Sequence, residues 1–305
     1  VGLQSIAFTD HCDINGEVER LYDFPFDPDG SWNAMMEVKE KYKGRLNVVC
    51  GIELGNATQY PEAARAVLDA HPYEFVIGSL HNLNRVPDFC VMNFGHMSDG
   101  LIKQLFDRSL DETLEMVQFP GITTLGHLTY MHRYVTLAGK KLDFKPYYDK
   151  IEAVFRALMA RDVAMEINVS TLWKGLGISM PTMELLKLYK DCGGKLVTIG
   201  SDAHAPENLG KAIRKGYAIL ETVGFHELVT IQNGQRIVGM EIVPAYSAGV
   251  TVRIERIGLQ MTGATGHVTL YIFHSSQRDP FKTIDFEVTK GNGSMEWKDL
   301  TDCYL

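Results

Sequence analysis

Apolar positions along the first 223 residues fall into two kinds of segment, which alternate along the chain. Short apolar runs that are rich in β-branched residues are typical of buried strands. We predict such strands at residues 3–9, 45–52, 75–77, 122–125, 163–167 and 196–199. Longer segments with apolar residues at helical spacing predict helices at residues 61–70, 101–117, 147–161, 182–192 and 208–223.

Strands that alternate with helices form a parallel sheet, and apolar strands without polar alternation have both faces covered. The predicted fold class is therefore α/β, with a barrel or a closed variant of a barrel as the arrangement that fits best. In barrels of this kind the functional side chains gather at the carboxyl ends of the strands. The residues that follow each predicted strand are therefore the first candidates for functional residues.

The last part of the chain has a different pattern. After a weak strand at 236–242, the sequence changes character at 244–249. The segments that follow are β-rich and separated by glycine and polar residues, at residues 250–257, 267–273 and 281–288. We predict a barrel domain at residues 1–243 and a small antiparallel β appendage at residues 244–305, whose role the sequence does not indicate.

The formal net charge of the 305-residue chain is −8, which argues against a surface that neutralises nucleic-acid phosphates. The expected partner is a small molecule, because a local basic pocket is enough to hold one phosphate ester. No apolar stretch is long enough to span a bilayer, and the first residues lack the pattern of a secretion signal. We therefore expect a cytoplasmic protein without a membrane partner. The five cysteines are scattered, with no Cys-x-x-Cys pair, which predicts free thiols.

Six residues with metal-binding side chains follow the predicted strands: His11, Glu53, His81, His127, Asp202 and His204. Imidazole and carboxylate groups suit divalent ions such as zinc, manganese or iron. A single histidine is more often a hydrogen-bonded or surface residue than a metal ligand. Six ligand-type residues in the same place relative to their strands favour a site for two or three divalent ions.

The segments that carry these residues resemble the ordered motifs of the PHP phosphoesterases. The motifs are Thr9-Asp-His11, Gly51-Ile-Glu53, Gly78-Ser-Leu-His81, Gly126-His127 and Gly200-Ser-Asp-Ala-His204. The similarity covers about residues 3–242, and the stretches 166–174 and 198–210 resemble the histidinol-phosphatase branch of that superfamily. The resemblance implies a distorted seven-stranded (β/α)7 barrel with a trinuclear metal centre.

The resemblance also implies a role for each candidate ligand. Glu53 would bridge two ions, and Asp202 would bind the first of them. His81 and His127 would bind the second ion. We therefore expect the donor atoms of Glu53, His81 and His127 to lie in a common coordination sphere.

The third ion of the implied centre would be bound by His11 and His204. The catalytic groups would be Glu53, Asp202 and His204. Asp10 would orient its neighbour His11 rather than bind an ion.

Two cations near the predicted strand ends are candidates for binding a substrate phosphate. Arg133 lies in a predicted loop after His127, and Lys174 follows the strand that ends at Asn168. Cationic side chains can hold phosphate through charge-assisted hydrogen bonds, although a solvated loop charge is an equally good interpretation of either residue. Among the other histidines, we predict structural or exposed positions for His71, His226 and His267, and leave the roles of His96 and His132 open.

One motif of the family is missing from the printed sequence. Members of the family begin with a His-x-His strand, followed by an acidic or histidine ligand, and this sequence begins after the place of that segment. The first ion would then keep only Glu53 and Asp202. The tail does not supply a replacement, because Ile272 lies two residues before His274, and we interpret residues 274–279 as a turn between strands.

The implied chemistry is the hydrolysis of a phosphate ester. A phosphate monoester dianion repels nucleophiles, and divalent ions overcome this by neutralising its oxygens and activating water. The resemblance implies L-histidinol phosphate as substrate, giving L-histidinol and phosphate in histidine biosynthesis. Two alternatives stay open: another phosphomonoester or phosphodiester substrate, or an impaired chain that binds metal or a phosphorylated ligand without turnover. The oligomeric state is open as well.

The chain as printed is expected to be a poor catalyst, and an added amino-terminal His-x-His strand is expected to raise its activity greatly. Metal affinity depends on the number and geometry of the ligands, so Glu53 and Asp202 alone should hold the first ion weakly. Metal content by mass spectrometry and phosphate release, measured on both versions, test this expectation. Three bound ions and undiminished turnover without the extension would contradict it.

Overall fold

The computed structural model describes residues 3, 5–21, 25–232, 234–239, 256–262, 265–272, 280, 282–290 and 292–300. The chain divides into two compact units, Val1–Glu241 and Ile242–Leu305. The change of character that the sequence indicates at residues 244–249 falls outside the described residues. The larger unit contains all six candidate metal ligands.

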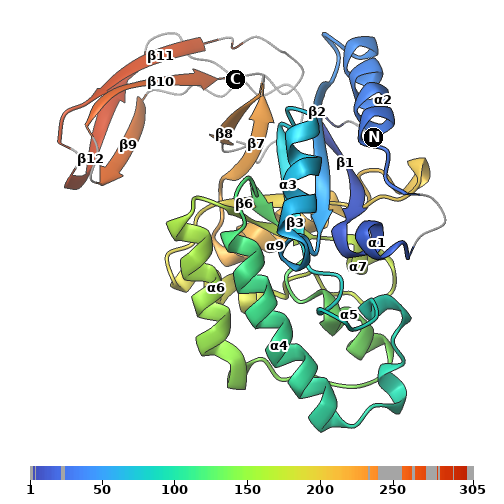
Figure 1. The fold of residues 1–305 in the computed structure, drawn as a ribbon. Helices are drawn as coiled ribbons and strands as arrows, with labels where there is room; N and C mark the ends of the chain where they lie inside the picture. Colours follow the sequence, from blue (N-terminus) through green and yellow to red (C-terminus); the bar gives the residue numbers. More distant parts are fainter. Residues whose placement is uncertain are drawn as a thin grey trace. The chain divides into compact units, whose positions relative to one another are not determined.

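Six strands form one parallel sheet in the larger unit, hydrogen-bonded in the order in which they occur along the chain (Figure 1). They are β1 (Ser5–Asp13), β2 (Asn47–Gly55), β3 (Phe75–Ser79), β4 (Thr124–Leu125), β5 (Ala164–Asn168) and β6 (Val197–Gly200). Every pair of neighbours in this sheet is parallel, so the carboxyl ends of all six strands lie along one edge. The predicted α/β fold class is confirmed.

Helices connect and cover these strands. The α-helices of the described residues are α1 (Ile14–Glu19), α2 (Pro28–Lys41), α3 (Pro61–Ala70), α4 (Asp99–Gln118), α5 (Tyr130–Leu137), α6 (Tyr148–Ala160), α7 (Ser170–Trp173), α8 (Met183–Asp191) and α9 (Ile213–Val223). Short 3₁₀ turns occur at Ala57–Gln59, Phe89–Val91, Phe94–His96, Lys145–Tyr147 and Pro206–Asn208. The longest helix, α4, packs against α6 (Figure 1).

The ends of α4 are marked in the sequence by Ser98 before its first residue and by Pro120 after its last turn. The side chain of Ser98 accepts a hydrogen bond from the backbone N–H of Leu101 at 3.2 Å, which satisfies one of the free donors of the first turn. The helix ends before Pro120, whose ring disfavours a helical conformation at the preceding residue. Its buried residues lie at helical spacing between Ile102 and Val117.

Five helices differ from the predictions, and among them the short helices α1 and α7 were not predicted. The segment around Arg133, predicted as a loop, is helix α5. Helix α2 was not predicted, because Met35 is its one fully buried residue among those described and the apolar periodicity is correspondingly weak. Helix α9 begins later than predicted, because Gly210 and Ala212 have φ angles of 71° and 60°, which a right-handed helix does not accommodate.

The seventh strand of the implied barrel takes a different form. The sheet joins six strands, and β7 (Leu228–Gln232) pairs instead with β8 (Gln235–Gly239) in an antiparallel hairpin. β7 lies next to β6 and β2, and Asn47 Nδ2 donates a hydrogen bond of 2.6 Å to the carbonyl of Ile231. The weak strand predicted at 236–242 corresponds to β8, and β7 itself was missed.

The smaller unit is built from antiparallel strands, as the sequence predicted. They are β9 (Arg256–Thr262), β10 (Gly266–Ile272), β11 (Lys282–Val288) and β12 (Asn292–Asp299). β10 pairs with β11 and β12 with β9. Ile284 and Leu300 form a small core on which Ile257, Leu270 and Ile272 pack. Residues 274–279, predicted as a turn, lie outside the described residues.

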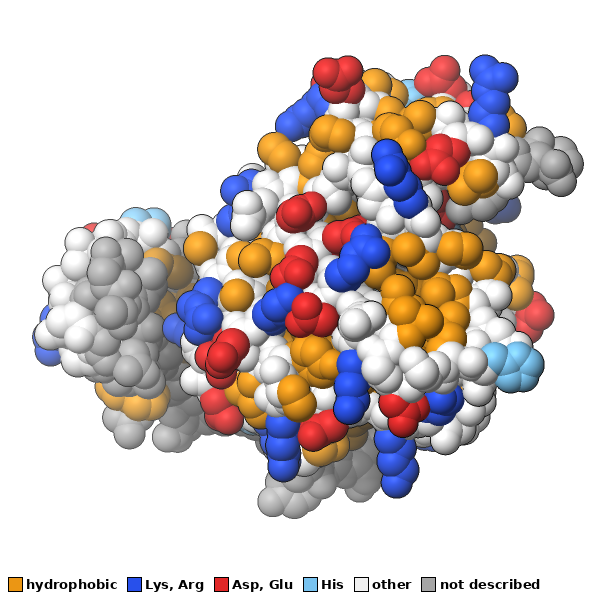
Figure 2. All heavy atoms as spheres, turned by 60° about the horizontal axis from the view of Figure 1, so that its bottom comes forward, with side chains coloured by type: hydrophobic (Ala, Val, Ile, Leu, Met, Phe, Trp, Pro, Cys, Tyr) orange, Lys and Arg blue, Asp and Glu red, His pale blue; other side chains and the backbone are white. Residues whose placement is uncertain are grey.

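Two further features of the described residues concern the surface charge and the cysteines. Acidic and basic side chains are intermixed on the face shown in Figure 2, with apolar side chains between them. No helix among the described residues is both long and apolar enough to cross a membrane. The thiols of Cys12, Cys50, Cys90 and Cys192 are free, and Cys303 lies outside the described residues.

Truncation of a buried side chain of α4 is expected to destabilise the larger unit, whereas truncation of its exposed neighbour is not. Ile102 is 2% exposed and Leu101 is 43% exposed. Ile102→Ala should lower the free energy of unfolding by about 2–5 kcal/mol, and Leu101→Ala should change it by no more than about 0.5 kcal/mol. Urea denaturation of both variants measures the difference. Equal losses would show that α4 does not pack as described.

Candidate metal centre

Three neighbouring strands place the first candidate ligands at one edge of the sheet. His11 in β1 is paired with Glu53 in β2, and β3, which adjoins β2, ends two residues before His81. Because these strands are parallel, side chains at their carboxyl ends meet at the same edge. His11 and Glu53 lie inside their strands rather than after them, because the ladder continues to Asp13 and Gly55.

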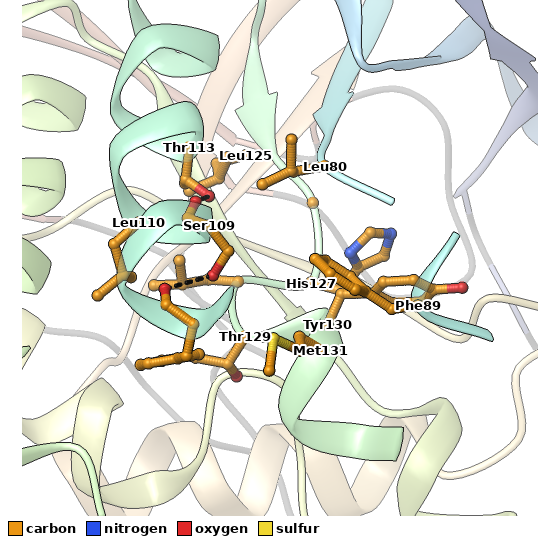
Figure 3. Close-up of a pocket in the computed structure, with 13 residues that line it drawn as sticks. Leu80, Phe89, Ser109, Leu110, Thr113, Leu125, His127, Thr129, Tyr130 and Met131 are labelled. Atoms are coloured by element: carbon orange, nitrogen blue, oxygen red, sulfur yellow. Dashed lines mark hydrogen bonds between the residues drawn. The ribbon is translucent and has the colours of Figure 1, made fainter. Parts of the chain in front are cut away.

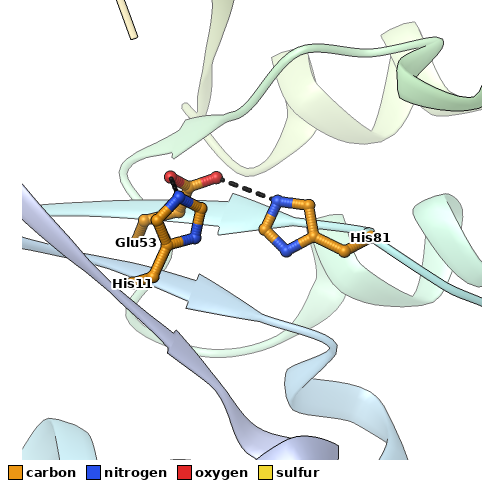
Figure 4. A group of neighbouring side chains, drawn as sticks. All are labelled: His11, Glu53 and His81. Atoms are coloured by element: carbon orange, nitrogen blue, oxygen red, sulfur yellow. Dashed lines mark ion pairs between the residues drawn. The ribbon is translucent and has the colours of Figure 1, made fainter. Parts of the chain in front are cut away.

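Glu53 occupies the centre of the cluster and is only 8% exposed. Its Oε1 lies 2.9 Å from Nε2 of His127 and 3.2 Å from Nε2 of His81, and accepts a hydrogen bond of 2.6 Å from Ser79 Oγ. Its Oε2 lies 3.5 Å from Nε2 of His11 (Figure 4). Potential ligand atoms of His11, Glu53 and His81 all lie within 4.8 Å of one another. Both carboxylate oxygens therefore face imidazole nitrogens.

His127, Asp202 and His204 complete the cluster. Nε2 of His127 lies 3.2 Å from Nε2 of His81. Nε2 of His204 lies 2.8 Å from Oδ1 of Asp202, and the ring centroids of His204 and His11 are 5.3 Å apart. His127 and Asp202 have φ angles of 20° and 49°, which L-residues rarely adopt. All six candidate ligands thus converge, and the backbone is strained at two of them.

The carboxylates of the cluster are held in their charged form. Burial raises the pKa of Glu53, but hydrogen bonds with His127 and His81 outweigh it and keep that pKa well below its ordinary value. Burial also opposes the ionisation of Asp202, yet the hydrogen bond with His204 brings the pKa of Asp202 down to about 2. Two negative charges therefore lie among the imidazoles at neutral pH.

Asp13 orients His81. Its Oδ1 lies 2.6 Å from Nδ1 of His81, which leaves Nε2 of the imidazole facing Glu53. Burial lowers the pKa of His81, but the charge of Asp13 outweighs it and the pKa lies well above its ordinary value. Gly55 makes this pairing possible, because a Cβ atom there would collide with Asp13 Oδ1. Asp13 was not among the predicted site residues, although its place two residues after His11 puts both side chains on one face of the strand.

Buried asparagines hold the backbone of the segment that carries His81. Asn56 Oδ1 accepts a hydrogen bond of 3.1 Å from the backbone N–H of His81. Asn56 Nδ2 donates to Asn15 Oδ1 at 2.8 Å and to Asn82 Oδ1 at 2.7 Å. These amides are uncharged, so the sequence alone does not mark them as site residues. Together they fix the position of a candidate ligand.

Glu166 is a further buried carboxylate beside the cluster that the sequence analysis left without a role. Its Oε2 accepts a hydrogen bond of 2.7 Å from the backbone N–H of His127. Burial raises the pKa of Glu166 to about 7. Gly200 leaves room for it, because a Cβ atom there would collide with Glu166 Oε1. The sequence signal for Glu166 was its position as the single charged residue of strand β5.

The two candidate phosphate-binding cations lie near the cluster. Arg133 is on α5, with its guanidinium carbon 5.3 Å from the centre of the Tyr134 ring, and its buried Nε has no partner among the described residues. Lys174 follows α7, with Nζ 5.1 Å from the centre of the Trp173 ring. Partial burial and the charge of Arg133 lower the pKa of Lys174, against the opposing effect of Asp202. Lys174 is thus within electrostatic reach of Asp202, and Arg133 is within electrostatic reach of Lys174.

Asp10 does not orient His11, in contrast to the expectation from the sequence. Adjacent side chains of a strand point to opposite faces, and Asp10 Oδ2 accepts a hydrogen bond of 2.7 Å from Ser31 Oγ of α2. The remaining histidines have other neighbours. His71 stacks on Trp32 and bonds to Asp29, His132 packs on Phe144, His267 bonds to Asp285, and His96 and His226 are exposed.

The donor set of the cluster fits divalent metal ions. Imidazole nitrogens and carboxylate oxygens are the ligands of zinc and related ions, at about 2.0–2.2 Å from the metal. Donors around one ion then lie about 3–3.5 Å apart, and the Glu53, His81 and His127 atoms are 2.9–3.2 Å apart. Small outward movements of the side chains would therefore suffice to admit an ion.

Comparison with known proteins assigns the chain to a family. A model of the PHP domain matches residues 1–170 of the chain. The chain belongs to the PHP domain family. The histidinol-phosphatase of Lactococcus lactis subsp. lactis (strain IL1403) is 27% identical over 231 residues, which cover 75% of this chain and 83% of that protein. A probable histidinol-phosphatase of Clostridium acetobutylicum is 27% identical over 217 residues, covering 71% of this PHP-domain chain and 81% of the relative.

A solved structure shares the fold of this PHP-domain chain. It is the crystal structure of the Lactococcus lactis histidinol phosphate phosphatase in complex with zinc, L-histidinol and phosphate. The superposition has a TM-score of 0.63 at 22% sequence identity, and covers 77% of this chain and 88% of that one. The likeness confirms the PHP barrel-like fold that the sequence motifs implied.

Loss of the Asp13 charge is expected to weaken metal binding by about 10- to 100-fold, because an amide no longer holds the imidazole of His81 with the same strength. Titration of Asp13→Asn with Zn²⁺ or Mn²⁺ measures this effect. Asp10→Asn, on the same strand, is the matched control, because Asp10 bonds to Ser31 outside the cluster. Equal affinities for the two variants would show that Asp13 has no part in holding the ligand.

Proposed function

We propose that this chain is a metal-dependent phosphatase that hydrolyses L-histidinol phosphate to L-histidinol and phosphate. The observation that carries the proposal is the buried Glu53 carboxylate, with both oxygens facing the imidazoles of His11, His81 and His127. The likeness to a histidinol phosphatase whose structure contains zinc, L-histidinol and phosphate supports the choice of substrate. Such a reaction belongs to histidine biosynthesis.

The proposed centre uses six side chains in three groups. Glu53 would hold two ions together, with Asp202 on the first of them. His81 and His127, whose Nε2 atoms are 3.2 Å apart, would hold the second. When bound, divalent ions supply positive charge for the phosphate oxygens and promote the ionisation of water near neutral pH.

His11 and His204 would hold a third ion on the exposed side of the cluster. Their side chains are 42% and 62% exposed, whereas that of His81 is 4% exposed. A ligand pair open to solvent leaves space for substrate and water, which a closed structural site does not. His204 would act there beside Asp202, its hydrogen-bond partner.

The chain's own cations would hold the phosphate. Arg133 has an unpartnered, buried Nε among the described residues, and its fork of N–H groups suits two phosphate oxygens at once. Lys174 lies over Trp173 together with Lys211, whose Nζ is 5.0 Å from the same ring. This cationic side of the site would orient the phosphate so that water displaces the alcohol in line.

The proposed partner is a small phosphorylated metabolite in the cytoplasm, and nucleic acids and membranes are not proposed as partners. The chain carries a net charge of −8, and the face in Figure 2 has acidic and basic side chains intermixed. Non-specific binding to nucleic acid depends on a concentrated positive surface. A local pair such as Arg133 and Lys174 is enough for one phosphate group.

Hydrolysis of L-histidinol phosphate is expected to exceed that of generic phosphomonoesters such as p-nitrophenyl phosphate when the metal centre is complete. Arg133→Met and Lys174→Met should each lower kcat/KM by about 10- to 100-fold, since each removes a charge-assisted hydrogen bond. Phosphate release with both substrates, with and without a chelator, measures these effects. Lys187→Met, on the exposed side of α8, is the matched control.

The outcomes separate three functions. Preference for L-histidinol phosphate and loss of turnover on chelation support the proposal. Equal or higher turnover of another phosphomonoester or of a phosphodiester would assign a different substrate. Metal binding without turnover of any ester would identify a binding protein in place of an enzyme.

A further inference from the structure

A small cavity lies directly behind one of the proposed metal ligands. It is bounded by α4 on one side and by the segment from Leu125 to Met131 on the other (Figure 3). Most of its lining is apolar, but His127, Thr129, Ser109 and Thr113 also contribute to it. The space is sufficient for about one water molecule.

Two buried polar atoms of this lining lack a hydrogen-bond partner among the described residues. They are Nδ1 of His127 and Oγ1 of Thr129. Nε2 of His127 faces Glu53 Oε1 at 2.9 Å, so a neutral imidazole that binds metal through Nε2 carries its proton on Nδ1. A buried donor and a buried hydroxyl in one cavity therefore both need an internal partner.

The buried face of α4 carries two hydroxyl groups where it meets the cavity. Ser109 and Thr113 interrupt an otherwise apolar stripe, and both are almost fully buried. Ser109 Oγ donates to the carbonyl of Phe106 at 2.7 Å, and Thr113 Oγ1 donates to the carbonyl of Ser109 at 2.6 Å. These bonds use the hydroxyl protons, so the oxygen lone pairs remain able to accept a hydrogen bond.

The backbone conformation of Thr129 is a further observation in favour of a role for its side chain. Its φ angle is 76°, in the left-handed region that β-branched residues seldom occupy. Strained residues of this kind persist where the surrounding structure requires their side chain or backbone in that place. The strained position here carries a hydroxyl, and that hydroxyl is buried beside the cavity.

We propose that one water molecule in this cavity accepts a hydrogen bond from Nδ1 of His127 and donates to Thr129 Oγ1 and Ser109 Oγ. Three bonds are the usual number for a buried water. Thr129 and Ser109 are then positioning residues: they act through the water on His127, fix its tautomer and aim Nε2 at the metal. The inference rests on the proposed function in so far as that function makes His127 a metal ligand.

This arrangement makes the two buried imidazoles unequal. His81 is held by a carboxylate, Asp13, whereas His127 is held by a neutral water and two hydroxyls. A carboxylate partner raises the basicity of a ligand imidazole more than a neutral partner does. The ion between them would therefore be bound more tightly by His81 than by His127.

A high-resolution crystal structure of the Zn²⁺-loaded chain tests the water directly. We expect one ordered water about 2.7–3.2 Å from Nδ1 of His127 and from Oγ1 of Thr129. A dry cavity, or a direct bond between the imidazole and the Thr129 hydroxyl, would overturn the proposal. This readout is independent of any phosphatase activity.

Variants test the positioning role. Thr129→Val keeps the shape of the side chain and removes its hydroxyl, and should weaken the binding of one Zn²⁺ ion by about 10- to 100-fold in a metal titration. Thr129→Ser, which keeps a hydroxyl at this position, should bind Zn²⁺ as the wild type does. Ser109→Ala should weaken binding in the same direction, and it replaces Thr129→Val as the decisive variant if that protein does not fold.

A purely structural role would lower the melting temperature of Thr129→Val and leave its metal affinity unchanged, and that outcome would overturn the inference while the proposed function stands. Metal binding that depends on Thr129, without turnover of L-histidinol phosphate by the wild type, would overturn the proposed function and leave this inference in place. A wild-type chain that binds no divalent ion would overturn the role assigned to Thr129.

Discussion

The burial of one carboxylate, Glu53, is the constraint on which the rest of the site depends. An ionised carboxylate in the interior is unfavourable unless charge and hydrogen bonds compensate it. Here the compensation comes from two sequence-distant segments, because Ser79 and His81 of one segment and His127 of another all contact the same oxygen. In this chain a parallel sheet with consecutive strand order brings those segments to one edge. The topology of the fold and the chemistry of the site thus both serve to compensate the buried charge of Glu53.

Around the candidate ligands lies a second set of residues that the strands alone do not determine. The sheet places the Cα atoms, but the direction of an imidazole depends on what its other nitrogen meets. Asp13 meets His81, and the room for it comes from Gly55, which carries no side chain. The backbone N–H of His127 is held by Glu166, which Gly200 accommodates in the same way. Two glycines, one at the end of β2 and one at the end of β6, therefore make room for the side chains that orient two ligands.

The fold class and the six candidate ligands could be predicted because both follow from periodicity and from position along a strand. The rest required three-dimensional structure, for reasons that particular residues illustrate. Helix α2 buries Met35 alone among its described residues, so its sequence carries little periodicity. Asp13, Glu166 and Asn56 matter through the residues they contact, and those lie up to 68 positions away. The hairpin β7–β8 depends on a pairing choice that alternation of apolar residues does not specify.

The charge of the site bears on whether metal ions bind before the substrate. Glu53 and Asp202 are both ionised at neutral pH, so without cations the site repels a phosphate dianion. Arg133 and Lys174 supply two positive charges, but the pKa of Lys174 is already lowered by partial burial and by Arg133. Together with the His81 imidazole, whose pKa is raised, these cations would do little more than balance the carboxylates of Glu53, Asp202 and Asp13. Divalent ions would therefore strengthen substrate binding before they contribute to the chemical step, and their removal should affect affinity as well as turnover.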